Sequence, residues 1–208
     1  MKPIVIENSL ISHKLTILRD KNTGTKKFRE LVNEISMFIC YEVLKDAKTK
    51  KVGVETPMMK TSGHMIDENH FAFVPILRAG MGMMEGLLSV LPNAQIGHIG
   101  LYRNEETLEP VRYYYKVPSE IKKREVFLLD PMLATGGSAV DAIKSLKADG
   151  ARNISFLCII AAPEGIKRIQ TEHPDVKIYT ASIDKKLNNI GYIIPGLGDA
   201  GDRIYGTK

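Results

Sequence analysis

The sequence has little cysteine: only Cys40 and Cys158 occur among its 208 residues. The two lie far apart, match no CxxC pattern and stand in apolar runs, where a buried, reduced thiol is the commoner role. The histidines show no ligand spacing either. The sequence therefore predicts a reducing, cytoplasmic setting and no metal cage built from the chain's own side chains.

Long apolar runs and blocks of like charge are also missing. No stretch approaches the ~18 apolar residues of a membrane helix, and the short apolar run at the amino terminus ends at Glu7, which is too brief for a signal peptide. Lysine and arginine are spread along the chain, so no nucleic-acid-binding arm is indicated. The net charge of +5 and the pI near 9.1 suit an anionic partner without distinguishing a phosphorylated metabolite from RNA.

What the chain does have is alternating strand and helix patterns, which predict an α/β fold with a mostly parallel sheet flanked by helices. Its length and its 44% apolar content suit one core, hence a single domain over residues 1–208 with an appendage. Strands are expected at residues 4–6, 52–57 (a short edge strand), 70–77, 95–101, 112–117, 126–129, 154–161 and 176–183. Helices are expected at residues 9–18, 25–43, 81–91, 139–149 and 163–173.

The most informative stretch is residues 126–141, VFLLDPMLATGGSAVD. A short apolar strand ends at Asp130, and a helix with Ser138 as its expected N-cap follows the adjacent Gly136 and Gly137. A glycine loop before a helix N-terminus binds phosphate well, because the first helical N–H groups are unpaired and glycine lets an anion approach them. Thr135 and Ser138 add hydroxyl donors.

Asp130 stands at the carboxyl end of its strand, where open α/β sheets bind ligands. An ionised carboxylate only accepts hydrogen bonds, and a sugar diol supplies two donors. The alternative is that Asp130 caps a turn and the two glycines only bend the chain. That alternative is less favoured, because a simple loop between strand and helix does not need two glycines, two hydroxyls and an acid together.

Arg78 leaves the end of the strand at residues 70–77, just before Gly80, and is placed to bind phosphate oxygens with its two-pronged guanidinium. Its alternative is an ordinary surface arginine. The glycines that follow are spaced G-x-G-x-x-x-G, one residue too long for a dinucleotide fingerprint. Further along the chain, Gly137 is followed by serine without lysine, so the G-K-[ST] ending of a nucleotide-triphosphatase P-loop is missing.

Residues 102–117 form the next feature. The strand at residues 95–101 leads to Tyr102, and residues 112–117, with three successive tyrosines, return after Pro110. This pattern predicts a hairpin arm. The tyrosines suit an amphipathic strand or a dimer surface better than base stacking.

The tail, residues 186–208, is rich in glycine, which makes a helix improbable, and Pro195 excludes a central strand. It is expected to be a rigid loop rather than a loose terminus, anchored by Ile190, Ile193, Ile194 and Leu197. Glycine exposes backbone N–H and C=O groups, which can read the edge of a small planar base.

Two of these segments resemble a known family. Residues 130–139, DPMLATGGSA, are similar to the loop that binds phosphoribosyl pyrophosphate (PRPP) in type I phosphoribosyltransferases. The wider family usually has two adjacent acids where this chain has Asp130-Pro131, which fits its uracil subgroup. Residues 192–203, YIIPGLGDAGDR, resemble the uracil-binding segment of the same enzymes, and the similarity begins near residues 13–20. The tail is accordingly named the hood.

The resemblance implies conversion of uracil and PRPP to UMP and pyrophosphate. It implies Mg²⁺ bound mainly through PRPP and pyrophosphate, a homodimer or higher homo-oligomer in which the arm participates, GTP as an effector, and no nucleic-acid or membrane partner. Catalysis would involve Asp199, Arg103 and Arg78, with Asp199 either polarising uracil N1–H or capping a turn. Uracil would be bound by Ile193, Gly198, Asp199 and Ala200. PRPP would be bound by Arg78, Arg103, Asp130, Pro131, Met132, Leu133, Ala134, Thr135, Gly136, Gly137, Ser138 and Asp199.

Other functions stay open at this point. A protein of this fold can act as an RNA-binding regulator, since fold does not fix function, and the net positive charge permits it. The intact loop at residues 135–138 and the intact hood favour the enzyme. A further alternative is a salvage enzyme for another base. The sequence of the hood is the evidence against it.

Overall fold

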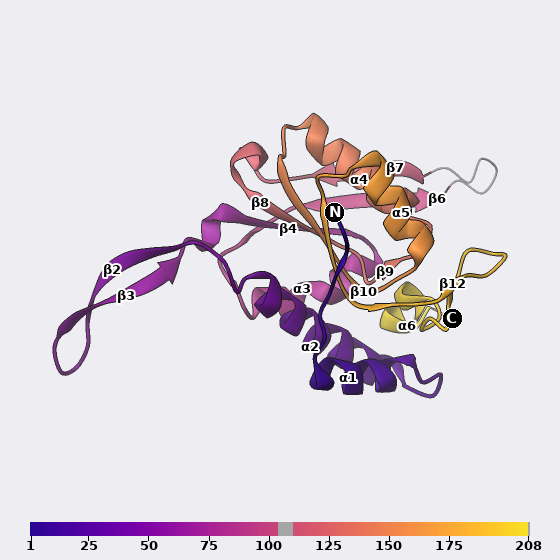
Figure 1. Ribbon diagram of the computed structural model, residues 1–208, viewed down its shortest axis with the longest axis horizontal. Coiled ribbons are helices and arrows are strands. Elements are labelled where there is room, and N and C mark those ends of the chain that lie inside the picture. Colours follow the sequence, from indigo (N-terminus) through magenta and orange to yellow (C-terminus); the bar gives the residue numbers. More distant parts are fainter. Residues whose placement is uncertain (104–109, 208) are drawn as a thin grey trace.

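The computed structural model describes residues 1–103 and 110–207. Its main sheet is parallel except for one pair, with the order β1-β11-β10-β8-β4-β6-β7 (Figure 1). The predicted mostly parallel sheet is therefore confirmed. The strands in this order are β1 Ile4–Val5, β11 Lys177–Ile183, β10 Asn153–Ala161, β8 Glu125–Leu129, β4 Phe71–Leu77, β6 His98–Arg103 and β7 Pro110–Lys116; short β5 Gln95–Ile96 pairs with β4, and β9 Met132–Leu133 with β10.

Helices cover both faces of this sheet (Figure 1). On β4, Phe71 and Phe73 pack with the helices of one face, whereas Ala72 and Val74 pack with those of the other. This alternation follows from the two-residue period of a strand and explains why central strands read as unbroken apolar runs. One face carries α1 Ser9–Arg19, α2 Thr25–Val43 and α3 Met84–Leu88, and the other carries α4 Gly137–Ala148 and α5 Pro163–Glu172.

Local sequence fixes several helix ends. The Asn8 side chain accepts a hydrogen bond from the Leu10 N–H at 2.8 Å and so caps α1. Pro163 begins α5, a position that needs no backbone donor. The expectation that Ser138 caps α4 is wrong. Gly136 is the N-cap, in the left-handed conformation, and Ser138 is the second residue of the helix, with an exposed side chain.

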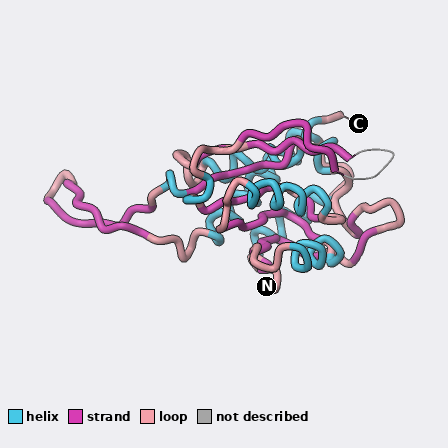
Figure 2. Tube along the Cα trace, turned by 90° about the horizontal axis from the view of Figure 1, so that it is seen from above, coloured by secondary structure: helices cyan, strands magenta, loops and turns pink. Residues whose placement is uncertain are grey.

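The predicted edge strand at residues 52–57 is also placed differently. It is part of β2 Thr49–Glu55, which pairs only with β3 Lys60–Ile66, and this hairpin projects far from the main sheet (Figures 1 and 2). At its tip Met58 and Met59 are 91% and 67% exposed. Such a hairpin has no core of its own within the described residues.

The predicted return of the chain after residue 102 is observed, because β7 runs antiparallel to β6 at the edge of the main sheet. Residues 104–109, between these two strands in the sequence, lie outside the described residues. The strand expected at residues 95–101 is divided into β5 and β6, and the helix expected at 81–91 is a 3₁₀ turn, Ala79–Met83, followed by α3.

The hood contains a short helix, α6 Ala200–Tyr205, which the sequence analysis wrongly considered improbable. Asp199 caps it, since its carboxylate accepts from the Asp202 N–H at 2.9 Å. Ala200 and Ile204 are buried, so tertiary packing outweighs the poor helix propensity of the adjacent glycine. The rest of the hood includes β12 Lys186–Leu187 paired with β13 Ile193–Ile194. None of the helices in residues 1–103 and 110–207 is long and apolar enough to cross a membrane.

Candidate active site

The candidate site lies at the carboxyl edge of the parallel strands. β4 and β8 are neighbours, with Pro75 opposite Leu129, so Arg78 and Asp130 both follow these strand ends. The two loops approach closely, because a Cβ on Gly80 would lie only 2.4 Å from the Leu129 carbonyl oxygen. The arginine and the acid that the sequence singled out therefore belong to adjacent loops.

The glycine loop before α4 is packed against the first turns of α5. A Cβ on Gly165 would lie 2.4 Å from the Ala134 carbonyl oxygen, and a Cβ on Gly136, at φ +79°, would lie 3.1 Å from the Gly165 carbonyl oxygen. Such contacts fix the loop with the N-terminus of α4 free to meet an anion. Thr135 and Ser138 are exposed there, as a phosphate-binding role requires.

Arg168 of α5 adds a positive charge that the sequence analysis missed. Its Nη1 would lie 3.3 Å from a Cβ on Gly137, and its Nε donates to Glu172 at 3.1 Å. A guanidinium beside the positive end of a helix favours an anion between them. No signal in the sequence joins residue 168 to residue 137; only the packing of α5 on the loop does so.

Asp130 has an unusual environment for a carboxyl group. Burial raises its pKa to about 7, although a hydrogen bond from the Met132 N–H opposes this, and the nearby charge of Asp199 raises it further. A carboxyl poised near neutrality gains from a partner that supplies hydrogen-bond donors, such as a sugar diol.

The hood is anchored by buried side chains. Ile193, Leu197 and Ala200 are 7%, 3% and 0% exposed, as expected for the first two. The other two predicted anchors are not buried: Ile190 is 73% exposed and Ile194 is 36% exposed. Pro195 follows a cis peptide bond, and Gly196 and Gly198 have positive φ. The hood is thus a defined loop with buried anchors at residues 193, 197 and 200.

The hood lies beside both loops of the sheet edge. Its Asp199 acts electrostatically on Asp130, and a Cβ on Gly191 would lie 3.6 Å from Cγ2 of Thr135. The Tyr205 hydroxyl donates to the Arg78 carbonyl oxygen at 3.0 Å. The segment predicted to bind a base therefore meets the loop predicted to bind a sugar phosphate.

Comparison with known proteins shows the family of this chain. A model of the family described as uracil phosphoribosyltransferase matches residues 5–207. The chain belongs to this family. It is 61% identical over 205 residues to a uracil phosphoribosyltransferase of Dictyoglomus thermophilum, covering 99% of both chains. A uracil phosphoribosyltransferase of Clostridium botulinum is 57% identical over 207 residues, which is 100% of this chain and 99% of that one.

Solved structures show the same fold. A protein from Aquifex aeolicus superposes with a TM-score of 0.94 at 40% identity, covering 100% of this chain and 99% of that chain. An adenine phosphoribosyltransferase of Trypanosoma brucei, solved with AMP, pyrophosphate and ribose-5-phosphate, has a TM-score of 0.54 at 14% identity. It covers 76% of this chain and 67% of its own, and this likeness shows the fold alone.

Arg78 and Arg103 are the two arginines predicted to bind PRPP. The Arg78 side chain is 61% exposed, with its Nη2 3.9 Å from Asp202 Oδ1 and its guanidinium 5.7 Å from the centre of the Tyr205 ring. Its donors are therefore largely open to an incoming anion. Arg103 is the last residue of β6, and its side chain lies outside the described part of the structure. A role for Arg103 stays a prediction.

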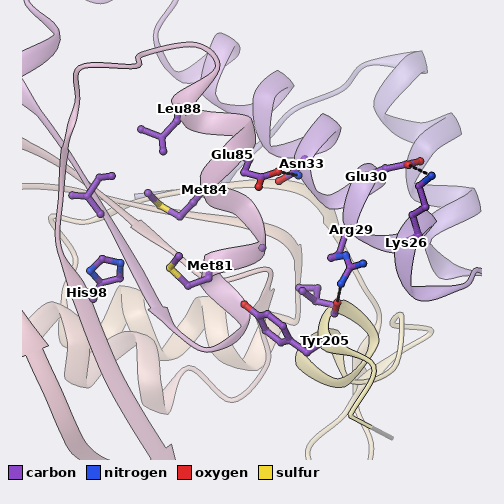
Figure 3. A pocket seen from close by; sticks show the side chains of 13 residues that line it. Lys26, Arg29, Glu30, Asn33, Met81, Met84, Glu85, Leu88, His98 and Tyr205 are labelled. Carbon is purple, nitrogen blue, oxygen red and sulfur yellow. Dashed lines mark hydrogen bonds and ion pairs between the residues drawn. The ribbon is translucent and has the colours of Figure 1, made fainter.

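A cavity of about 570 Å³ lies behind the Arg78 loop, between α2, α3 and α6 (Figure 3). Met81 and Tyr205 line it, together with Arg29, Asn33 and Glu85 of the neighbouring helices. The residues predicted to bind PRPP or uracil do not line this cavity. The predicted site is therefore formed by the converging loops and lies outside this cavity.

Among residues 1–103 and 110–207, no three acidic, histidine or cysteine side chains converge as a metal site. The acids near the strand ends, Asp130 and Asp199, are hard oxygen donors of the kind that Mg²⁺ accepts alongside substrate oxygens and water. This donor set fits a metal carried in by phosphate groups better than a metal held by the protein alone.

Proposed function

We propose that this chain transfers the phosphoribosyl group of PRPP to uracil, giving UMP and pyrophosphate, as a step of pyrimidine salvage. The observation that carries the proposal is the position of residues 191–205 against both the loop at 130–138 and the loop of Arg78. A base and a sugar phosphate bound at these two places would be adjacent, as a transfer between them requires.

For PRPP, residues 131–138 would bind the 5′-phosphate side and Asp130 would accept from the two ribose hydroxyls. Arg78 and Arg103 would bind the pyrophosphate group through charge-assisted hydrogen bonds. Arg168 would add charge beside the helix N-terminus. These assignments give each of the named groups one part of a single ligand.

The reaction makes little covalent demand on the protein. Uracil N1 attacks the ribose C1′, the bond from C1′ to the pyrophosphate oxygen breaks with its electron pair remaining on pyrophosphate, and the N1 proton passes to solvent. Positive charge builds on the sugar while negative charge builds on the leaving group, so Asp130 and Asp199 would stabilise the former and the arginines the latter. Asp130 and Asp199 would lie beside a Mg²⁺ ion brought in with PRPP, and such an ion would further neutralise the charge of pyrophosphate.

Uracil would be read by the backbone of the hood. It presents acceptor, donor and acceptor along O2, N3–H and O4. The Ile193 carbonyl would accept from N3–H, and an N–H near Gly198 or Ala200 would donate to O4. Cytosine leaves both groups unpaired, at ~1–3 kcal/mol each when buried.

Recognition of uracil by the backbone of the hood predicts that the protein selects uracil over other bases in a direct assay. We mix the protein, PRPP, Mg²⁺ and each free nucleobase, and follow nucleotide formation. Uracil should give UMP, and kcat/KM for cytosine should be lower by about 100-fold or more. A comparable rate with cytosine contradicts backbone reading. Absence of nucleotide with every base, together with salt-sensitive RNA binding, would instead identify an RNA-binding regulator.

The two roles of Asp199 separate by mutation. Asparagine caps a helix about as well as aspartate, so Asp199→Asn should preserve α6 and remove only the charge. If the carboxylate polarises uracil N1–H, kcat should fall by about 10- to 100-fold while the thermal midpoint is unchanged. Unchanged turnover would leave capping as the role of Asp199. The measurement is steady-state kinetics beside thermal unfolding.

The same proposal covers the oligomeric state of the protein, its effector and its cellular compartment. We expect a homodimer or higher homo-oligomer, supported by the exposed Met58 and Met59 of the projecting hairpin. We also expect activation by GTP, which is tested by adding GTP to the uracil assay. The buried, free thiols of Cys40 and Cys158 suit a reducing cytoplasm. Nucleic acid and membrane are not among the proposed partners.

A further inference from the structure

Arg19 and Asp184 form an ion pair beneath the uracil segment of the hood. The arginine ends α1, and the acid follows β11, 165 residues later in the chain. The contact is two-pronged: Arg19 Nη2 lies 2.5 Å from Asp184 Oδ1, and Nη1 lies 2.7 Å from Oδ2. Asp184 is only 6% exposed. Neither residue belongs to the sites described above.

The pair holds Gly196 by both of its backbone groups. Arg19 Nη1 donates to the Gly196 carbonyl oxygen at 2.7 Å, and the Gly196 N–H donates to Asp184 Oδ2 at 2.8 Å. Ser182 completes the cluster, because its hydroxyl donates to Asp184 at 3.0 Å and accepts from Arg19 at 3.2 Å. The carboxylate thus has donors at both oxygens, and the orientation of Gly196 is fixed.

Gly196 in turn lies against the Ile193 carbonyl. At φ +65°, Gly196 turns back so closely that a Cβ on it would lie 2.1 Å from the Ile193 oxygen. Ile193 is itself held by pairing with Leu187 and by burial of its side chain. The backbone of Gly196 therefore lies in close contact with this carbonyl, which is the acceptor proposed for uracil N3–H.

The charge state of Asp184 supports a role of the pair in positioning the backbone of the hood. Burial raises the pKa of Asp184, but the hydrogen bonds from Arg19 and Gly196 outweigh it and hold the pKa below its usual value. A buried ion pair contributes little net stability compared with apolar residues of the same size, and its best-attested use is to specify one arrangement. Here the arrangement specified is that of residues 193–196.

We propose that Arg19 and Asp184 are positioning residues for the pyrimidine, which set uracil affinity and base selectivity by holding Gly196 and, through it, the Ile193 carbonyl. This inference rests on the proposed uracil transfer. Because the pair touches the base only through the backbone of the hood, and the 130–138 loop is held separately by α5, its loss should affect uracil much more than PRPP.

The test is Asp184→Asn, which keeps the shape of the side chain and removes its charge. We expect KM for uracil to rise about tenfold, KM for PRPP to stay within about twofold, and the preference for uracil over cytosine to fall about tenfold. Arg19→Lys keeps a positive charge but loses the fork, so it should shift the same quantities in the same direction by a smaller factor. It serves as the second variant if Asp184→Asn folds poorly.

Asp175→Asn is the matched control. Asp175 pairs with Lys147 at 2.6 Å, remote from the hood and more than half exposed, so this variant should leave both KM values unchanged. A folded Asp184→Asn or Arg19→Lys protein with unchanged uracil KM, or with PRPP KM raised equally, would overturn the proposal. A wild-type protein that forms no UMP overturns the proposed function itself, whereas UMP formation with an unaffected variant overturns only the positioning role.

Discussion

Replacing Asp130 by asparagine should lower kcat/KM for PRPP by about 100-fold, because two hydrogen bonds from the ribose hydroxyls lose their charged acceptor. The asparagine amide also presents a donor where the diol presents donors. KM for uracil should change much less than kcat/KM for PRPP. Steady-state kinetics with each substrate varied in turn measures both.

The same substitution should stabilise the ligand-free protein above neutral pH. Burial raises the pKa of Asp130 from 3.8 to about 7 in the folded state. Between these values the folded protein holds the proton that the unfolded chain has lost, so the free energy of unfolding falls as pH rises and is lowest above pH 7. Asp130 is only partly buried, so solvent screening reduces this effect, and the gain from Asp130→Asn at pH 8 should be on the order of 1 kcal/mol.

The pH dependence of activity should have the opposite sign. The proposed binding of PRPP requires the ionised form of Asp130, so kcat/KM should rise as pH increases through about 7, and this step should be absent in Asp130→Asn. Because PRPP also titrates, the difference between the two profiles is the informative quantity. Asp67→Asn, at the base of the projecting hairpin, is the control and should change neither profile. An Asp130→Asn protein with wild-type kcat/KM at pH 8 contradicts the assignment.

The central sheet and the phosphate loop were predictable because they follow local rules. β4, β8 and β10 are buried on both faces, so their apolar runs appear directly in the sequence. The loop at residues 135–138 combines glycine with hydroxyl side chains before an apolar helical face, which is a local signal. The sequence was therefore enough to show which residues follow the ends of the core strands.

Two elements, β3 and α6, were not predicted from the sequence, each for a different reason. β3, KTSGHMI, pairs only with β2 and has no buried residue, so it lacks the alternation that marks a strand on a core. α6 has only six residues, and one of them is glycine. It forms because Asp199 caps it and Ile204 is buried. Its helix propensity is overruled by tertiary contacts, which no local window contains.

The residues that hold the hood were invisible for a third reason. Arg19 meets Asp184 and Gly196 across more than 160 residues, and Arg203 donates to the Leu18 and Leu197 carbonyl oxygens at 3.0 and 2.7 Å while stacking on Phe28. These arginines bind backbone carbonyls, whose positions depend on the completed fold. A charged residue in a sequence does not reveal such partners.

Gly80→Ala should disrupt the active site as strongly as the loss of Asp130, without removing any functional side chain. The new Cβ would lie 2.4 Å from the Leu129 carbonyl oxygen and 3.2 Å from Pro75, so the Arg78 loop must move away from the end of β8. Backbone atoms cannot yield as a flexible side chain does, and such overpacking lowers the free energy of unfolding by about 1–3 kcal/mol. A displacement of about 1 Å between catalytic groups costs roughly 100-fold in rate.

We therefore expect kcat/KM for PRPP in Gly80→Ala to fall about 100-fold at a temperature where the protein remains folded. Gly53→Ala is the matched control, because a Cβ at Gly53 meets no atom within 4 Å and its φ is not positive. It should change unfolding by no more than about 0.5 kcal/mol and leave kinetics unaltered. If Gly80→Ala is destabilised but retains wild-type kcat/KM for PRPP, the close approach of the two loops serves folding alone, and the spacing between Arg78 and Asp130 is not what the reaction depends on.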